Sequence, residues 1–248
     1  REGVALPVLD CELNDEFTGC YTTQTVIKKA NRLAQDRLVD AETACALVAG
    51  ACATDYNRDA FKQAWRDTLF SHFHDILPGS GVHDTRTYTH GLFQQCMAIT
   101  AMEETKALRA LGALIDTSSL DTPAADVPPS RLPAALGSGV GFGAVNGALS
   151  AAEQSRGHGS RPFVIFNGLS NDRSDVVEVT VWDDACRADA WQWREQALQH
   201  TPFAVTGPDG ETVAAQIIQV GDYWGHRYVR LAFPAQVPGT GYAVYTVT

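Results

Sequence analysis

The sequence predicts an α+β chain in which a three-helix bundle is followed by an antiparallel β-sheet or β-sandwich domain. Over residues 23–116 apolar residues recur at intervals of three and four, which is the period of helices with one buried face. Beyond Pro162 the apolar period becomes two, which is typical of strands. Between these regions, residues 117–160 are rich in Pro, Gly and Ser, and we expect a linker there.

The first helix is expected to be long and amphipathic. Residues 1–22 alternate proline, acidic and apolar positions without a helical period, so they predict an extended lead-in to it. Thr22 or Thr23 can cap its start, because a threonine hydroxyl accepts hydrogen bonds from the first backbone N–H groups. We expect its apolar stripe to be core: Val26, Ile27, Ala30, Leu33, Ala34, Leu38, Ala41, Cys45, Val48 and Cys52.

Two further apolar stripes complete the predicted bundle. The second helix carries its stripe into His74 and Asp75 and ends at Pro78-Gly79, because proline has no N–H to donate and glycine tolerates positive φ. The third helix follows a cap at Asp84 or Thr85. The stripes comprise Phe61, Trp65, Leu69 and Phe73, and then Leu92, Phe93, Cys96, Ile99, Ala107, Leu108, Leu111 and Ile115.

Residues 161–248 predict the β domain. Its strands are expected at 163–166, 177–181, 213–220, 228–233 and 242–247, separated by Gly- and Pro-containing turns at 207–210 and 238–241. If residues outside this chain complete the sheet, its edges are exposed here, and we expect homo-oligomers or aggregates. The aromatic pairs Tyr223-Trp224 and Trp191/Trp193 offer rings for sugar stacking, although packing is the more frequent role of such residues.

Composition excludes several classes of function. The formal net charge of −10 opposes binding to nucleic acid, which draws on clustered Lys and Arg. The sequence contains no apolar run long enough to span a bilayer and no secretory signal pattern, so we expect no membrane partner. The six cysteines form no Cys-x-x-Cys motif. We therefore expect buried thiols, a reducing compartment and a cytoplasmic location.

The best candidate for chemistry is the segment around His74 and Asp75, because four of the seven histidines (His72, His74, His83 and His90) lie near it. Two interpretations stay open at this point. A histidine at a helix end interacts favourably with the helix dipole, and neutral imidazole is also a common zinc ligand. His72 and His74 point in different directions on a regular helix, so only one could hold a given metal. Zinc needs three or four ligands, and any further ones must come from elsewhere.

Other candidate groups are assigned no chemistry. Glu103-Glu104 falls in a helical repeat and Asp183-Asp184 in a turn, so we expect both pairs to be solvated charge. Ser80 lies in Pro-Gly-Ser-Gly rather than in a nucleophile elbow, and we expect a turn residue. The glycine run at 137–143 lacks the spacing and the preceding strand of a nucleotide-binding loop.

Three motifs resemble glycoside hydrolase family 38 α-mannosidases. The run His74 to Ser80 (His-Asp-Ile-Leu-Pro-Gly-Ser) follows about fifty residues after Gly19 to Gln24 (Gly-Cys-Tyr-Thr-Thr-Gln) and after the segment Lys28 to Arg32. In this order and separation they resemble the middle region of these enzymes. The run Pro162 to Ser170 resembles the strand that opens their C-terminal β region, so the resemblance covers nearly the whole chain.

The resemblance implies hydrolysis of α-mannosides with retention, by an aspartate nucleophile and an aspartate acid/base, with one zinc ion that grips sugar hydroxyls. It implies that His74 is the zinc ligand contributed by the middle domain and that Asp75 contacts the bound sugar. The remaining zinc ligands of these enzymes come from an N-terminal α/β domain. His72 stands where relatives carry other polar residues, so the resemblance implies no ligand role for it.

The chain also departs from the family. Relatives have several hundred residues of catalytic domain before the Gly-Cys-Tyr-Thr motif, whereas here about twenty residues precede it. We therefore expect no catalytic residue in this chain, an incomplete Zn²⁺ site, and the missing N-terminal catalytic domain as a partner. The separate chain should not turn over an α-mannoside, because retaining glycosidases need two carboxyl groups about 5 Å apart. The alternative function is a non-catalytic scaffold or carbohydrate-binding module.

Overall fold

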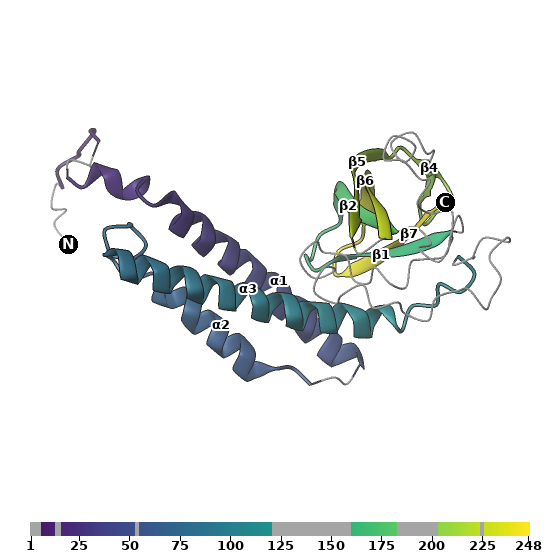
Figure 1. The fold of residues 1–248 in the computed structure, drawn as a ribbon, viewed down its shortest axis with the longest axis horizontal. Coiled ribbons are helices and arrows are strands. Elements are labelled where there is room, and N and C mark those ends of the chain that lie inside the picture. Colours follow the sequence, from purple (N-terminus) through teal and green to yellow (C-terminus); the bar gives the residue numbers. More distant parts are fainter. Residues whose placement is uncertain (1–5, 13–15, 53–54, 121–159, 183–202, 224–225) are drawn as a thin grey trace. The chain divides into compact units, whose positions relative to one another are not determined.

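The structure is a computed structural model that describes residues 6–12, 16–52, 55–120, 160–182, 203–223 and 226–248. Its internal contacts divide the chain into two compact units. The first consists of Arg1–Glu42 and Asn57–Ala101, and the second of Thr43–Tyr56 and Met102–Thr248. Helices and strands are numbered in chain order, and Figure 1 labels them except β3.

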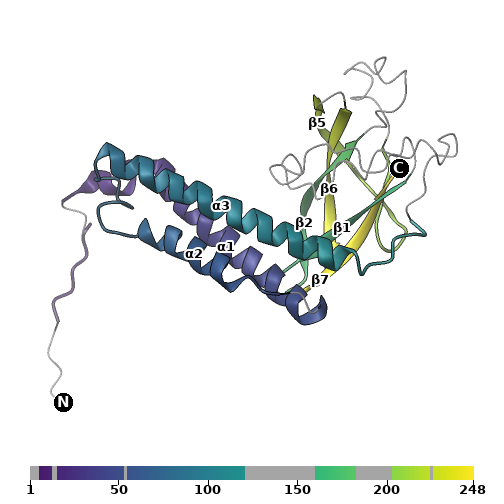
Figure 2. The same ribbon diagram turned by 60° about the horizontal axis from the view of Figure 1, so that its bottom comes forward.

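Three helices that lie side by side make up most of the first unit, and the first and third continue into residues that belong to the second unit (Figures 1 and 2). They are α1 (Thr25–Cys52), α2 (Arg58–Phe70) and α3 (His83–Gly112), preceded by the 3₁₀ turn η1 (Thr18–Tyr21). Asn57 caps α2, since its side chain accepts a hydrogen bond from the backbone N–H of Ala60 at 3.3 Å. The buried apolar side chains of this unit are Ile27, Ala30, Ala34, Leu38, Ala41, Phe61, Ala64, Ile76 and Cys96.

The helix boundaries differ from the sequence prediction. The first helix begins at Thr25, so the residue before it is Gln24, with φ 52°, rather than Thr22 or Thr23. The third begins at His83, which places the expected caps Asp84 and Thr85 inside its first turn.

The end of α2 is the larger difference. The helix stops at Phe70, and tight turns follow, in which the N–H of His72 donates to the carbonyl of Leu69 at 3.1 Å. Leu69 and Phe73 are 52% and 53% exposed, although the apolar stripe predicts that they are core. Because this end of the stripe is not buried, packing does not hold the helix as far as His74.

Two more predictions about burial are wrong. Val26 and Leu33 belong to the predicted stripe of α1 but are exposed, because the buried face of α1 instead follows the small residues Ala30, Ala34 and Ala41. Glu103 was expected in solvent, yet it is 6% exposed and its Oε1 lies 3.2 Å from the Lys106 ammonium. Cys45 and Cys96 are buried, as predicted.

The second unit contains two antiparallel sheets. One has the order β1-β7-β3-β4, formed by β1 (Arg161–Asn167), β7 (Gly241–Val247), β3 (Val205–Thr206) and β4 (Thr212–Val213). The other has the order β2-β6-β5, formed by β2 (Arg173–Trp182), β6 (His226–Val237) and β5 (Gln216–Tyr223). Their shared core includes Val179, Val181, Val205, Val229, Leu231, Phe233, Ala243, Tyr245 and Val247.

An α+β chain with three helices followed by antiparallel sheets is thereby confirmed. The expected domain boundaries and the association through strand edges stay predictions. Most of the expected linker, the glycine run at 137–143, Asp183-Asp184, Cys186, Trp191/Trp193 and Trp224 lie outside the described residues. None of the helices in the described ranges is both long and apolar enough to cross a membrane.

Candidate functional site

His74 and Asp75 lie in the turn region between α2 and α3, and both side chains face solvent. The His74 side chain is 79% exposed and that of Asp75 is 57% exposed. Nε2 of His74 lies 3.5 Å from Oδ2 of Asp75, and its ring is 4.3 Å, between centroids, from the ring of Phe73. An imidazole and a carboxylate are therefore presented together, with the imidazole open to a ligand or to another protein surface.

The turns after Asp75 hold this segment in a defined conformation. The N–H of Gly79 donates to the carbonyl of Ile76 at 2.9 Å, and that of Gly81 to the carbonyl of Asp75 at 2.8 Å. The side chain of Ile76 is 4% exposed, so it anchors the loop in the apolar interior of the first unit. Ser80 follows these turns directly, and its Oγ lies 3.4 Å from both the carbonyl O and Oδ1 of Asp75.

The loop packs against the segment that precedes α1. Gly79 has φ 84°, and a Cβ added to it would lie 2.8 Å from Cβ of Gln24 and 2.8 Å from the carbonyl O of Thr23. Only glycine allows such a close approach at this φ. The two motifs that resemble the mannosidase middle region are thus in direct contact in the folded chain.

Lys28 joins the same two segments by hydrogen bonds. Its Nζ donates to the carbonyl of Thr23 at 2.6 Å, of Leu77 at 3.0 Å and of Pro78 at 3.2 Å. The ammonium group has three N–H bonds, and these three carbonyls match that number. Lys28 belongs to the motif at residues 28–32, but the sequence predicts no role for it, because nothing in the local pattern shows which distant carbonyls it reaches.

His72 is held differently from His74. Its Nε2 lies 2.8 Å from Oδ1 of Asn31 and 3.2 Å from Nε2 of Gln35, both on α1. One ring nitrogen either donates to the asparagine oxygen or accepts from the glutamine amide, depending on the tautomer. The two histidines are therefore not arranged as a pair: His72 is tied to α1, and His74 projects into solvent.

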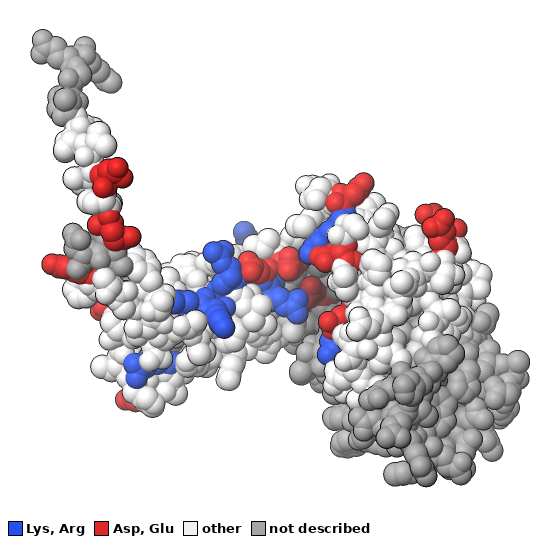
Figure 3. Space-filling model, turned by 90° about the horizontal axis from the view of Figure 1, so that it is seen from above, with Lys and Arg blue, Asp and Glu red and all other residues white. Residues whose placement is uncertain are grey.

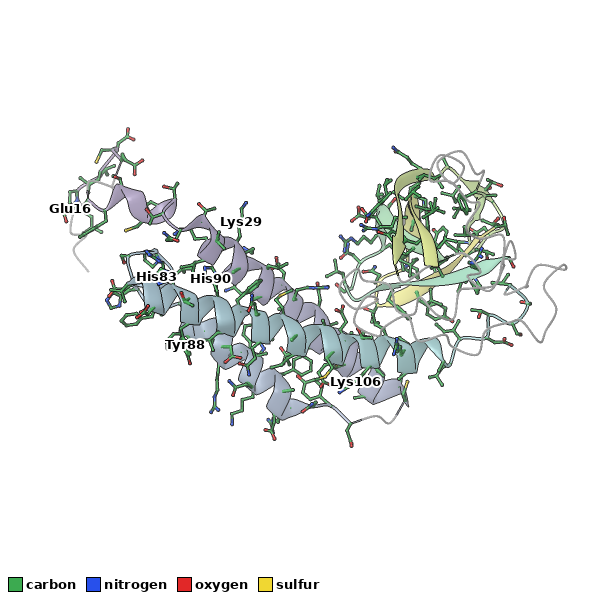
Figure 4. All side chains as sticks on the ribbon, viewed as in Figure 1. Glu16, Lys29, His83, Tyr88, His90 and Lys106 are labelled. Carbon is green, nitrogen blue, oxygen red and sulfur yellow. The ribbon has the colours of Figure 1, made fainter. Side chains whose placement is uncertain are left out.

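The remaining histidines of the group lie on α3 (Figure 4). His83 is 82% exposed, and its Nδ1 is 3.4 Å from Oδ1 of the adjacent, fully exposed Asp84. Among the residues that the structure describes, no three His, Cys, Asp or Glu side chains come together to hold a metal ion. These residues therefore do not make a metal site by themselves, and His74 fits a metal only as one ligand of a site completed by other groups.

Charge is mixed on the face of the molecule that Figure 3 shows. Figure 3 shows Lys and Arg side chains over the helices with Asp and Glu side chains beside them, and further acidic side chains along the segment before α1. A mixed surface of this kind suits a neutral polar ligand better than a polyanion, which is bound by clustered positive charge.

The described chain therefore combines a helical region, which carries the exposed turn at His74 and Asp75, with two antiparallel sheets that follow it. Residues 15–111 match the alpha mannosidase middle domain. Over these residues the chain is therefore similar to the middle domain of α-mannosidases, as the motifs indicated.

Individual proteins are similar to parts of this chain or share its fold. An α-mannosidase of Saccharomyces cerevisiae is 30% identical over 107 residues, which is 40% of this chain and 10% of the yeast protein. The fold is similar to that of a glycosyl hydrolase family 38 protein from Enterococcus faecalis, with TM-score 0.53 and 19% identity over 94% of this chain and 25% of that one. An α-mannosidase from the same organism gives TM-score 0.55 and 19% identity over 94% and 24%. The chain thus spans at most a quarter of the length of these relatives.

Proposed function

We propose that this chain is part of a retaining, zinc-dependent α-mannosidase that hydrolyses terminal α-mannosides. In this proposal His74 is one zinc ligand and Asp75 contacts the substrate, while the nucleophile, the acid/base and the other zinc ligands belong to a catalytic domain that this chain does not include. The observation that carries the proposal is the exposed His74-Asp75 turn within a domain that matches the α-mannosidase middle domain.

The chemistry of the turn is consistent with both roles. An exposed imidazole offers a ring nitrogen to a metal without the cost of removing a buried partner. A carboxylate accepts hydrogen bonds from sugar hydroxyls, and Asp75 is exposed enough to do so. When bound, the zinc ion would orient sugar hydroxyls. This chain's own part is to fix the position of His74 and Asp75.

The separate chain is proposed to be inactive. Retention needs one carboxylate as nucleophile and another carboxyl group as acid/base at about 5 Å. Asp75 is proposed as a binding group and cannot supply both functions. The scaffold or carbohydrate-binding alternative is not favoured, since the relatives named above are α-mannosidases or family 38 glycosyl hydrolases. A reducing, cytoplasmic compartment is proposed from the cysteines, because the six in the sequence form neither a Cys-x-x-Cys motif nor a dense disulfide framework.

The experiment uses the longer enzyme from which this chain is proposed to come. His74→Ala should abolish zinc occupancy, measured by elemental analysis, and most activity on an aryl α-mannoside, with the unfolding temperature nearly unchanged. Asp75→Asn should raise KM for the aryl α-mannoside and leave most of the zinc bound. His83→Ala is a matched control, because His83 is also an exposed histidine followed by an aspartate. Full zinc content and rate in His74→Ala would reject the assigned role.

A further inference from the structure

We propose that Lys28 is a positioning residue for the turn that carries His74 and Asp75. This inference rests on the proposed function, in which that turn contributes to the zinc and sugar site. Lys28 would act through the backbone of Leu77 and Pro78, two or more residues beyond Asp75, and would touch neither metal nor substrate.

The geometry gives Lys28 a specific partner on each side. Its ammonium lies 2.6 Å from the Thr23 carbonyl, before α1, and 3.0 and 3.2 Å from the carbonyls of Leu77 and Pro78, in the loop after α2. The bonds to Leu77 and Pro78 are partly buried. Hydrogen bonds from a charged donor are stronger than neutral ones, and partial burial reduces competition from water.

The Lys28 contacts act beside the close packing of Gly79 on Gln24 and the burial of Ile76. Packing prevents the loop from moving closer to Gln24 but does not prevent the loop from moving away. The hydrogen bonds from Lys28 to two consecutive carbonyls of the loop oppose that outward movement. The segment between Ile76 and Gly81 is thereby held on both sides. His74 and Asp75 lie directly before this segment, so the segment fixes their position.

Lysine suits this place better than arginine. A compact ammonium directs three N–H bonds toward three carbonyls around it, whereas the planar guanidinium directs its five N–H groups within one plane. We therefore expect Lys28→Arg to keep the charge but to recover only part of the function, and Lys28→Met to lose all three hydrogen bonds at nearly the same side-chain length.

The first test measures the loop in this 248-residue chain. Amide hydrogen exchange of Gly79 and Gly81, which donate to Ile76 and Asp75, should be at least about tenfold faster in Lys28→Met than in the parent chain. Lys29→Met is the matched control, because Lys29 is the exposed neighbour on α1 and loses the same charge (Figure 4). Equal exchange rates in the Lys28 and Lys29 variants would overturn the inference.

The second test uses the longer enzyme, at a temperature where every variant is fully folded. Lys28→Met should lower kcat/KM for an aryl α-mannoside by about tenfold to a hundredfold, because small displacements of positioned groups cost that much. Lys28→Arg should be intermediate, and Lys29→Met should match the parent. A purely structural lysine would lower the unfolding temperature and leave kcat/KM unchanged, which would overturn the inference.

Comparison with His74→Ala separates the two proposals. If His74→Ala is inactive and Lys28→Met retains full activity, the positioning role is wrong and the proposed function stands. If His74→Ala is fully active, the proposed function is wrong, and the inference that depends on it is wrong as well. Loss of activity in both variants, together with faster exchange at Gly79, supports both.

Discussion

Gly79 packs directly on Gln24, and both residues adopt positive φ, 84° and 52°. A Cβ on Gly79 would lie 2.8 Å from Cβ and 2.9 Å from Cγ of Gln24, and 2.8 Å from the backbone carbonyl of Thr23. Two segments that are far apart in the sequence therefore meet at a contact that is possible only because glycine has no side chain. The loop carrying His74 takes its place from this contact.

Gly79→Ala should destabilise the chain by about 1–3 kcal/mol, because alanine is strained at this φ and its methyl group would overlap the carbonyl of Thr23. Urea unfolding followed by circular dichroism measures the effect. The control is Gly91→Ala in α3, where an added Cβ meets no atom within 4 Å. That variant should gain about 0.5–1 kcal/mol from helix propensity. Equal stability of the two variants would contradict the close packing of Gly79 on Thr23 and Gln24.

Asn167 holds together two turns of the β region. Its Nδ2 donates to the carbonyls of Asn171 at 2.9 Å, Pro238 at 3.1 Å and Val237 at 3.3 Å, and its Oδ1 accepts from the N–H of Leu169 at 3.0 Å. The residue is 6% exposed, so these partners lose their hydrogen bonds without full access to water when the side chain is removed.

Asn167→Ala should therefore destabilise the chain by about 2–3 kcal/mol. Asn171→Ala is the control, because its exposed Nδ2 makes one hydrogen bond, to the carbonyl of Asp172 at 3.3 Å. That variant should change the free energy of unfolding by about 0.5 kcal/mol or less. The two free energies are compared by chemical unfolding, and a loss of equal size in both variants would show that the Asn167 network contributes little.

Local pattern predicted the class of the fold but not its details. The alternation of apolar and polar residues in β2 and β6 predicts which side chains are buried, because one face of each strand packs on the core. Val179 and Leu231 are two of these buried side chains. The two-residue strand β3 is not predicted and β4 is merged with β5 into one predicted strand at 213–220, because two residues cannot display a period, although the turn at 207–210 is predicted. In α2 the apolar stripe continued past the end of the buried surface.

The candidate site shows the same limit. His74 and Asp75 are adjacent in the sequence, so a local motif was enough to single them out. The contacts of Lys28 with Leu77 and of Gly79 with Gln24 join residues about fifty positions apart, and no period or spacing encodes such a pairing. Their positions became visible only in the folded chain.

Cys96 should be an unreactive thiol. Burial raises its pKa and the nearby Asp67 raises it further, while Thr68, whose Oγ1 lies 3.4 Å from Sγ, opposes the shift. Thiolate is the reactive form, so modification with a disulfide reagent at neutral pH should be fast at exposed Cys11 and slow at Cys96 until the chain is unfolded. Mass spectrometry of peptides measures both rates, and comparable rates in the folded chain would refute the burial.

The same shift affects alkaline stability. Because the pKa of Cys96 is higher in the folded chain, its contribution to stability is complete below the pKa of the unfolded thiol and is lost as the pH rises through the folded value. Cys96→Ser lacks a group that titrates in this range. The free energy of unfolding should therefore fall less steeply above about pH 8.5 in this variant than in the parent chain. Parallel pH profiles would contradict the prediction.

Asp175 should contribute to stability in the opposite pH range. The backbone N–H of Val176 donates to its Oδ1 at 2.8 Å and the Arg173 guanidinium donates to its Oδ2 at 2.8 Å, and both lower the pKa of this exposed carboxyl. A lowered pKa gives stability that is present above the pKa of the unfolded aspartate and is lost as the pH falls through the folded value. Asp175→Asn should therefore flatten the acid limb of the pH profile below about pH 4.

The cause of the Asp175 shift can be tested separately by NMR titration of its carboxyl carbon. Arg173→Ala should raise the pKa of Asp175 only part of the way to its usual value, because the hydrogen bond from Val176 is the larger cause and remains in this variant. Asp209→Asn, a change at an exposed aspartate in the turn between β3 and β4, should leave the titration of Asp175 unchanged. Complete restoration of the usual pKa by Arg173→Ala would assign the shift to the ion pair and reject the dominant role of the backbone hydrogen bond.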